Sequence, residues 1–119
     1  MTRRIVLIED DPDIAALVRE MLIEAGHEVD VRSELPDGAI DADMQLVITD
    51  LLALRSYDHE TAREWIARVR VAFPRATIIV STAHAPAAGA GPALRADAVL
   101  TKPFDVAVFT RTVEALLGA

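Results

Sequence analysis

Four short apolar runs rich in β-branched residues constrain the fold of this chain more than any other feature. They occupy residues 5–8, 46–49, 77–80 and 98–101. Runs of this length and composition predict strands that are buried on both faces, and such strands belong to parallel sheets. Stretches with helical periodicity separate them, which predicts an α/β fold with helices on both faces of the sheet.

Each of these runs ends in polar or charged residues. In chain order these are Glu9, Asp10 and Asp11, then Asp50, then Ser81 and Thr82, and finally Lys102. Ligands bind at the carboxyl ends of the strands in open α/β sheets, so these side chains are expected to form one site. Clustered carboxylates repel each other unless a cation joins them, and their oxygens are the ligands that Mg²⁺ prefers. Taken alone, the first acidic cluster fits the start of a helix equally well, because Asp is a favoured N-cap.

In their order and spacing, these segments resemble the receiver domain of two-component response regulators. The matching stretches are residues 5–14, 46–51, 78–83 and 100–104. Each is a weak motif alone, but together they are specific, and the resemblance covers essentially the whole chain as one receiver domain, residues 1–119. It implies a doubly wound, five-stranded parallel sheet in the flavodoxin-like order 2-1-3-4-5.

The resemblance also implies what the acidic residues do. Asp50 is the expected phosphoacceptor, which takes a phosphoryl group from the phosphohistidine of a sensor histidine kinase or a phosphotransfer protein. Glu9, Asp10 and Asp50 are the expected side-chain ligands of Mg²⁺, and the backbone carbonyl of Leu52 is a further expected ligand. Such a protein is a phosphoacceptor signalling domain that promotes its own phosphorylation and dephosphorylation, and is not counted as an enzyme.

Lys102 and Thr82 are the expected partners of the phosphoryl group. Lys102 is expected to pair with Asp50 before phosphorylation and to contact a phosphoryl oxygen afterwards, aimed inward by a cis bond to Pro103. Thr82 is expected to donate its hydroxyl to the phosphoryl group. Asp11 is interpreted as an N-cap in preference to an acid that supports the metal ligands from behind.

The periodicity places the remaining elements. We expect strands at about 4–8, 28–31, 46–49, 77–81 and 98–101, and helices at about 12–25, at 60–72 and from Asp105 onward. Pro12 suits a first helical turn and Gly26 suits a helix stop. The predicted buried faces are Ile14, Leu17, Val18, Met21 and Leu22 in the first helix, Trp65, Ile66, Val69 and Phe73 in or after the second, and Val106, Val108, Phe109, Val113, Leu116 and Leu117 in the last.

Three of the departures from the family pattern concern the helices and the switch. Pro36 and Gly38 leave room for a shortened second helix of one or two turns at about 37–42, interpreted as a tolerated surface deletion. Prolines and glycines in residues 83–92 predict a loop, with a turn at about 92–95, in place of a regular fourth helix. Position 99 is Val where the family has an aromatic that couples to the Thr, so we expect either another switching element, such as residues 85–91, or no switch there.

Charge and composition exclude several functions. The net charge of −7 argues against binding nucleic acid through this domain. The absence of Cys excludes disulfides and thiolate metal sites. No run is long enough to cross a membrane, and the start of the chain does not resemble a signal peptide, so a cytoplasmic protein is expected. The chain ends at Ala119, just past the last predicted helix, which predicts a single-domain regulator.

Two other functions stay open. A phosphorylation-independent pseudo-receiver would act as a protein–protein adaptor, and the Val at position 99 favours it. A small α/β phosphohydrolase with an aspartyl nucleophile generally needs a second acid two residues later, where Leu52 stands. Either receiver interpretation implies a downstream protein target and is compatible with an oligomer.

Overall fold

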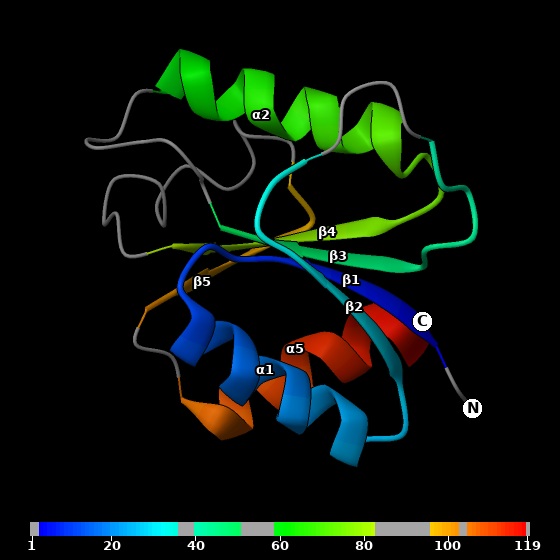
Figure 1. Cartoon of the computed structure of the whole chain (residues 1–119), viewed down its shortest axis with the longest axis vertical. Coiled ribbons are helices and arrows are strands. Elements are labelled where there is room, and N and C mark those ends of the chain that lie inside the picture. The colour runs from blue at the N-terminus through cyan, green and yellow to red at the C-terminus, as the bar shows by residue number, and fades with distance from the viewer. Residues whose placement is uncertain (1–2, 36–39, 51–58, 83–95, 103–104, 119) are drawn as a thin grey trace.

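The computed structural model describes residues 3–35, 40–50, 59–82, 96–102 and 105–118. Five parallel strands form one sheet in the order β2-β1-β3-β4-β5, which confirms the predicted topology. The strands are β1 (Arg4–Ile8), β2 (Glu28–Arg32), β3 (Leu46–Thr49), β4 (Thr77–Thr82) and β5 (Ala98–Thr101). Helices α1 (Pro12–Glu24) and α5 (Val106–Gly118) cover one face of the sheet, and α2 (His59–Ala72) covers the other (Figure 1).

The central strands are mainly apolar because helices cover the sheet on both sides. All four residues of β3 are buried, as are the last four of β1. Side chains alternate between the two faces of a strand, so neighbouring residues enter different cores. One core lies against α2 and includes Ile66, Val69 and Phe73. The other lies against α1 and α5 and includes Leu22, Phe109 and Val113.

The register of the strands brings their carboxyl ends together. Ile8 pairs with Thr49 across β1 and β3, and Thr82 pairs with Thr101 across β4 and β5. The residues that follow these strands therefore emerge at one edge of the sheet.

Helix α1 begins and ends as its sequence predicts. The Asp11 side chain accepts hydrogen bonds from the backbone N–H groups of Asp13 (2.9 Å) and Ile14 (3.3 Å), so the N-cap interpretation of Asp11 is confirmed. At the other end Ala25 is the C-cap, one residue earlier than a helix to residue 25 would place it. Gly26 follows with φ of +93°, a conformation that residues with a Cβ rarely adopt.

Three residues assigned to buried faces are exposed, and those predictions are wrong. Leu17 is 54% exposed, Val106 at the start of α5 is 58% exposed and Val108 is 40% exposed. In α1 the buried residues are Ala15, Val18 and Leu22, a spacing of three and four that leaves residue 17 off the stripe. Helix α1 contains more large apolar residues than its buried face can cover.

Three other boundaries differ from the predicted ones by a single residue. Strands β2 and β4 each end one residue later than expected, and α2 begins one residue earlier. Of the helix expected at 37–42, residues 37–39 lie outside the described residues, and residues 40–45 contain a turn but no helix. The expected loop at 83–91 and turn at 92–95 also lie outside them. Within the described ranges, every helix is too short or too polar to cross a membrane.

Candidate functional site

One edge of the sheet carries four charged residues that form the candidate site, namely Glu9, Asp10, Asp50 and Lys102, and backbone hydrogen bonds fix three of them. The N–H of Glu9 donates to the carbonyl of Arg32 (3.0 Å), and that of Asp50 donates to the carbonyl of Ile8 (2.9 Å). On the far side of β3, the N–H of Lys102 donates to the carbonyl of Thr82 (2.7 Å). The ladder thus continues one residue past each strand, which holds the side chains that follow in a defined orientation.

Three carboxylates meet at this edge. One oxygen from each of Glu9, Asp10 and Asp50 can be chosen so that all three lie within 4.8 Å of one another. Their exposure differs, because Glu9 is buried, Asp50 is half-buried and Asp10 is exposed. Three carboxylates this close match the oxygen donors that a hard divalent cation such as Mg²⁺ takes in proteins.

Lys102 already lies against two of these acids. Its Nζ donates to Glu9 Oε1 at 2.5 Å and lies 3.5 Å from Asp50 Oδ2. The expected pairing with Asp50 is therefore present, but the nearer partner is Glu9, which the sequence did not indicate. The Lys102 side chain is only 13% exposed, so its charge acts in a partly desolvated setting.

Burial raises the pKa of the Glu9 carboxyl above its ordinary value of 4.5. The hydrogen bond from Lys102 opposes this rise, and the nearby charge of Asp50 adds to it. The backbone N–H of Asp11 also donates to Glu9 Oε2 at 3.3 Å, which favours the ionised form. Glu9 therefore holds its proton more tightly than an exposed carboxyl does, despite its lysine partner.

The acidic triplet divides into two functions. Glu9 and Asp10 join the cluster at the sheet edge, whereas Asp11 caps α1. The N-cap interpretation therefore holds for Asp11, whereas the metal site stays a prediction for Glu9 and Asp10.

Thr82 ends β4 and is fully buried, next to Ser81, which is also buried. Its carbonyl holds the backbone of Lys102, so the hydroxyl-bearing residue and the lysine are neighbours at the edge. Leu52 and Pro103, which were expected to complete the site, lie outside the described residues.

One contact at the site was missed from the sequence. The indole Nε1 of Trp65, on α2, donates to Thr49 Oγ1 at 2.9 Å, and Thr49 Oγ1 donates to the carbonyl of Asp50 at 2.7 Å. The sequence placed Trp65 at the edge of the core, where it does pack. The only signal for its bond was the general rule that a buried indole N–H finds an acceptor.

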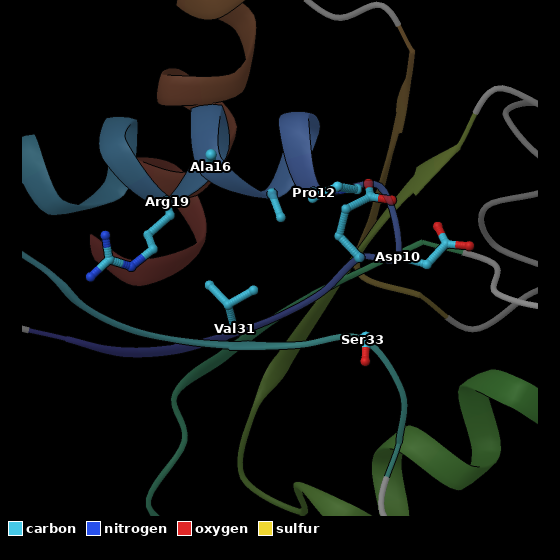
Figure 2. Close-up of a pocket in the computed structure, with 8 residues that line it drawn as sticks. Asp10, Pro12, Ala16, Arg19, Val31 and Ser33 are labelled. Carbon is cyan, nitrogen blue, oxygen red and sulfur yellow. The ribbon is translucent and has the colours of Figure 1, made fainter.

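A shallow pocket adjoins the acidic cluster on its α1 side. Figure 2 shows Asp10 and Arg19 at opposite ends of this hollow, with Val31 and Ser33 across from α1. The residues that line it are Glu9, Asp10, Pro12, Ala15, Ala16, Arg19, Val31 and Ser33. Its two acids belong to the cluster already described, so the pocket extends that site.

The whole chain was compared with known proteins. No protein-family model matches the chain. The regulatory protein VanRB of Enterococcus faecalis is 34% identical over 120 residues, which cover 98% of this chain and 53% of VanRB. The chain thus spans about half the length of this curated relative.

Solved structures match over nearly the full length of both chains. A response regulator receiver protein from Burkholderia phymatum is 25% identical with a TM-score of 0.72, covering 98% of this chain and 95% of that one. The response regulator protein TrrA of Thermotoga maritima, solved in complex with Mg²⁺ and a beryllium fluoride, is 26% identical with a TM-score of 0.69, covering 97% and 99%.

Proposed function

The chain is a response regulator receiver domain of two-component systems, and on that premise we propose that it accepts a phosphoryl group on Asp50. The observation that carries the proposal is the meeting of Glu9, Asp10, Asp50 and Lys102 at the carboxyl edge of the sheet. Three acids and one lysine in a partly desolvated setting suit the transfer of a highly charged group.

The proposed reaction is an in-line displacement at phosphorus. A carboxylate oxygen of Asp50 attacks the phosphorus of a phosphohistidine on the partner, the P–N bond breaks, and the imidazole leaves with its electron pair and takes up a proton. The product is an acyl phosphate on Asp50. Little covalent chemistry falls to the protein, so its contribution is to position the acceptor and to balance charge.

The carboxylates fit a divalent cation. Glu9, Asp10 and Asp50 would hold Mg²⁺, joined by the backbone carbonyl of Leu52 and by water, since Mg²⁺ usually keeps several waters. When bound, Mg²⁺ neutralises negative charge on the phosphoryl oxygens. The TrrA structure, which contains Mg²⁺ and a beryllium fluoride, supports the same occupancy here.

Lys102 and Thr82 would serve the transferred group. Lys102 Nζ lies within ion-pair distance of both Glu9 and Asp50, so a short movement would let it contact a phosphoryl oxygen on Asp50. Thr82 stands beside it at the end of β4 and would donate its hydroxyl to another phosphoryl oxygen. Both groups stabilise charge on the phosphoryl group and neither takes part in bond breaking.

The proposed partners follow from the reaction. The donor is a sensor histidine kinase or a phosphotransfer protein, and the acyl phosphate would change contacts with a downstream protein. The net charge of −7 makes nucleic acid an unsuitable partner for this domain. A phosphodonor of this kind places the domain in the cytoplasm.

The test is intact mass after incubation with Mg²⁺ and acetyl phosphate. Wild type is expected to gain one phosphoryl group, and the gain is expected to require Mg²⁺. Asp50→Asn, which keeps the shape of the side chain but removes the nucleophile, is expected to gain none. A phosphoryl group on Asp50→Asn at the wild-type level would contradict the proposal.

A pseudo-receiver adaptor is the second candidate, and Val99 favours it. Val99 packs, partly buried, against the core on the α2 side, where it cannot rotate as an aromatic ring would. If wild type binds Mg²⁺ but gains no phosphoryl group from acetyl phosphate or from a histidine kinase, the adaptor is the better description.

A further inference from the structure

Two hydrogen bonds in series connect α2 with the backbone of Asp50. Trp65 Nε1 donates to Thr49 Oγ1 (2.9 Å), and Thr49 Oγ1 donates to the Asp50 carbonyl (2.7 Å). An indole N–H can only donate and a carbonyl can only accept. The Thr49 hydroxyl between them must therefore accept the hydrogen bond from Trp65 and donate its own proton to the Asp50 carbonyl. The orientation of the Thr49 O–H bond follows from these two partners.

The surroundings of Thr49 hold its hydroxyl in this orientation. Its side chain is fully buried, so water does not compete for the hydroxyl. Trp65 is held in place by two contacts. It packs against the core between α2 and the sheet, and the Arg68 guanidinium lies over its ring, 5.4 Å from the centroid. Without the indole, the Thr49 hydroxyl would lose the donor that helps to hold its oxygen in place.

Asp50 is consequently fixed through both of its backbone polar groups. Its N–H donates to Ile8 on β1, and its carbonyl accepts from Thr49, which Trp65 orients from α2. Together these bonds set the backbone torsions of Asp50 and hence the direction of its Cα–Cβ bond. The same direction brings its Oδ2 to 3.5 Å from Lys102 Nζ.

We propose that Trp65 is a positioning residue for the phosphoacceptor and acts through the hydroxyl of Thr49. The inference rests on the proposed phosphorylation of Asp50. An acceptor oxygen that must attack phosphorus in line loses rate steeply when it is displaced, so a fixed backbone at Asp50 raises the rate of transfer.

The test compares the maximal initial rate of phosphoryl gain, at saturating acetyl phosphate and Mg²⁺, by intact mass at timed intervals. Thr49→Val removes the hydroxyl and keeps the branched shape, whereas Thr49→Ser keeps the hydroxyl and is the matched control. We expect Thr49→Val to lower the maximal rate about tenfold, and Thr49→Ser to stay within about twofold of wild type. The donor concentration at half-maximal rate should change little, because the hydroxyl does not contact the donor.

Trp65→Phe tests the route of the effect. It removes the N–H and keeps an aromatic ring, so it should also slow the maximal rate. In a Thr49→Val background the same change should have no further effect, because the hydroxyl through which Trp65 acts is already gone. Thermal unfolding of each variant shows which of them are folded at the assay temperature.

Each outcome decides the inference. Wild-type rates in Thr49→Val, or a further loss from Trp65→Phe in that background, would overturn it while leaving the phosphorylation of Asp50 intact. If wild type gains no phosphoryl group, both the proposed function and this inference fall. Should Thr49→Val not fold, the comparison of Trp65→Phe with Thr49→Ser decides, since only the first should be slow.

Discussion

Removal of the Lys102 charge tests how the acidic cluster is held together without metal. In Lys102→Met, Glu9 loses a partner at 2.5 Å and Asp50 loses one at 3.5 Å. At an effective dielectric constant of about 20, these contacts correspond to gross attractions of roughly 7 and roughly 5 kcal/mol. Desolvation of the three groups offsets most of this, so we expect a net loss of about 2–4 kcal/mol in the free energy of unfolding near pH 8.

The loss should depend on pH in a defined direction. In wild type, burial raises the pKa of Glu9 and Lys102 opposes the rise, so removal of Lys102 raises that pKa further. A protonated Glu9 no longer needs a cation. As pH falls through the raised pKa, the part of the cost that comes from Glu9 should shrink, so the substitution should cost less near pH 5 than near pH 8.

Urea unfolding of Lys102→Met and wild type at these two pH values, in the presence of a chelator, measures the difference. Lys102→Arg keeps a positive charge and is the control for the loss of packing. An equal cost at both pH values would show that Glu9 is not the group that Lys102 neutralises. No cost at either pH would show that the observed ion pairs add nothing net to stability.

The remaining predictions concern Glu9, the metal and the ends of α1. Because the folded Glu9 carboxyl holds its proton more tightly than the unfolded one, the unfolded chain ionises first, and the Glu9 contribution to metal-free stability should fall as pH rises through the window between 4.5 and the raised pKa. Urea titration of Glu9→Gln should show this contribution missing, as a difference in pH slope from wild type. Mg²⁺ at about 100 times its Kd should raise the stability of wild type by about 2.7 kcal/mol, or roughly 10 °C in Tm for a chain of this length, and Asp10→Asn should reduce that gain in the same thermal scan. Asp11→Ala removes the N-cap of α1 and should cost about 1 kcal/mol, with the rate of phosphoryl gain unchanged if Asp11 is no metal ligand. Gly26→Ala should cost about 1–2 kcal/mol through backbone strain alone, since a Cβ there would meet no atom within 4 Å, and a Gly26→Asn variant with a smaller loss would support that cause.

The sheet could be predicted from the sequence because each buried parallel strand leaves a local pattern, a short apolar run followed by polar residues. A strand that is covered on both faces is mainly apolar, as residues 46–48 of β3 are, and charged residues then begin where it ends. Parallel pairing brings those ends to one edge, so Glu9 and Asp50 could be placed together from the order of the segments alone. The single-residue errors at strand and helix ends reflect the ordinary fraying of such boundaries.

What failed depended on contacts between distant segments. Leu17 was assigned to the core because it recurs at helical spacing with Ile14 and Met21, but only the packed helix decides which residues at that spacing are covered. The preference of Lys102 for Glu9 depends on side-chain geometry across two strands. The bond from Trp65 to Thr49 joins residues 16 apart on different elements, and no periodicity encodes it.

The measurement that most directly tests the central claim is the location of the phosphoryl group in the phosphorylated chain. After brief exposure to acetyl phosphate and Mg²⁺, borohydride reduction converts an aspartyl phosphate into homoserine, and tryptic peptides are sequenced by mass spectrometry. Cleavage at Arg residues puts Asp50 in the peptide 33–55 and the acids Glu9, Asp10 and Asp11 in the peptide 5–19. We predict homoserine at position 50 alone. Homoserine at position 10 or 11, with position 50 unmodified, would contradict the assignment of Asp50 as the acceptor.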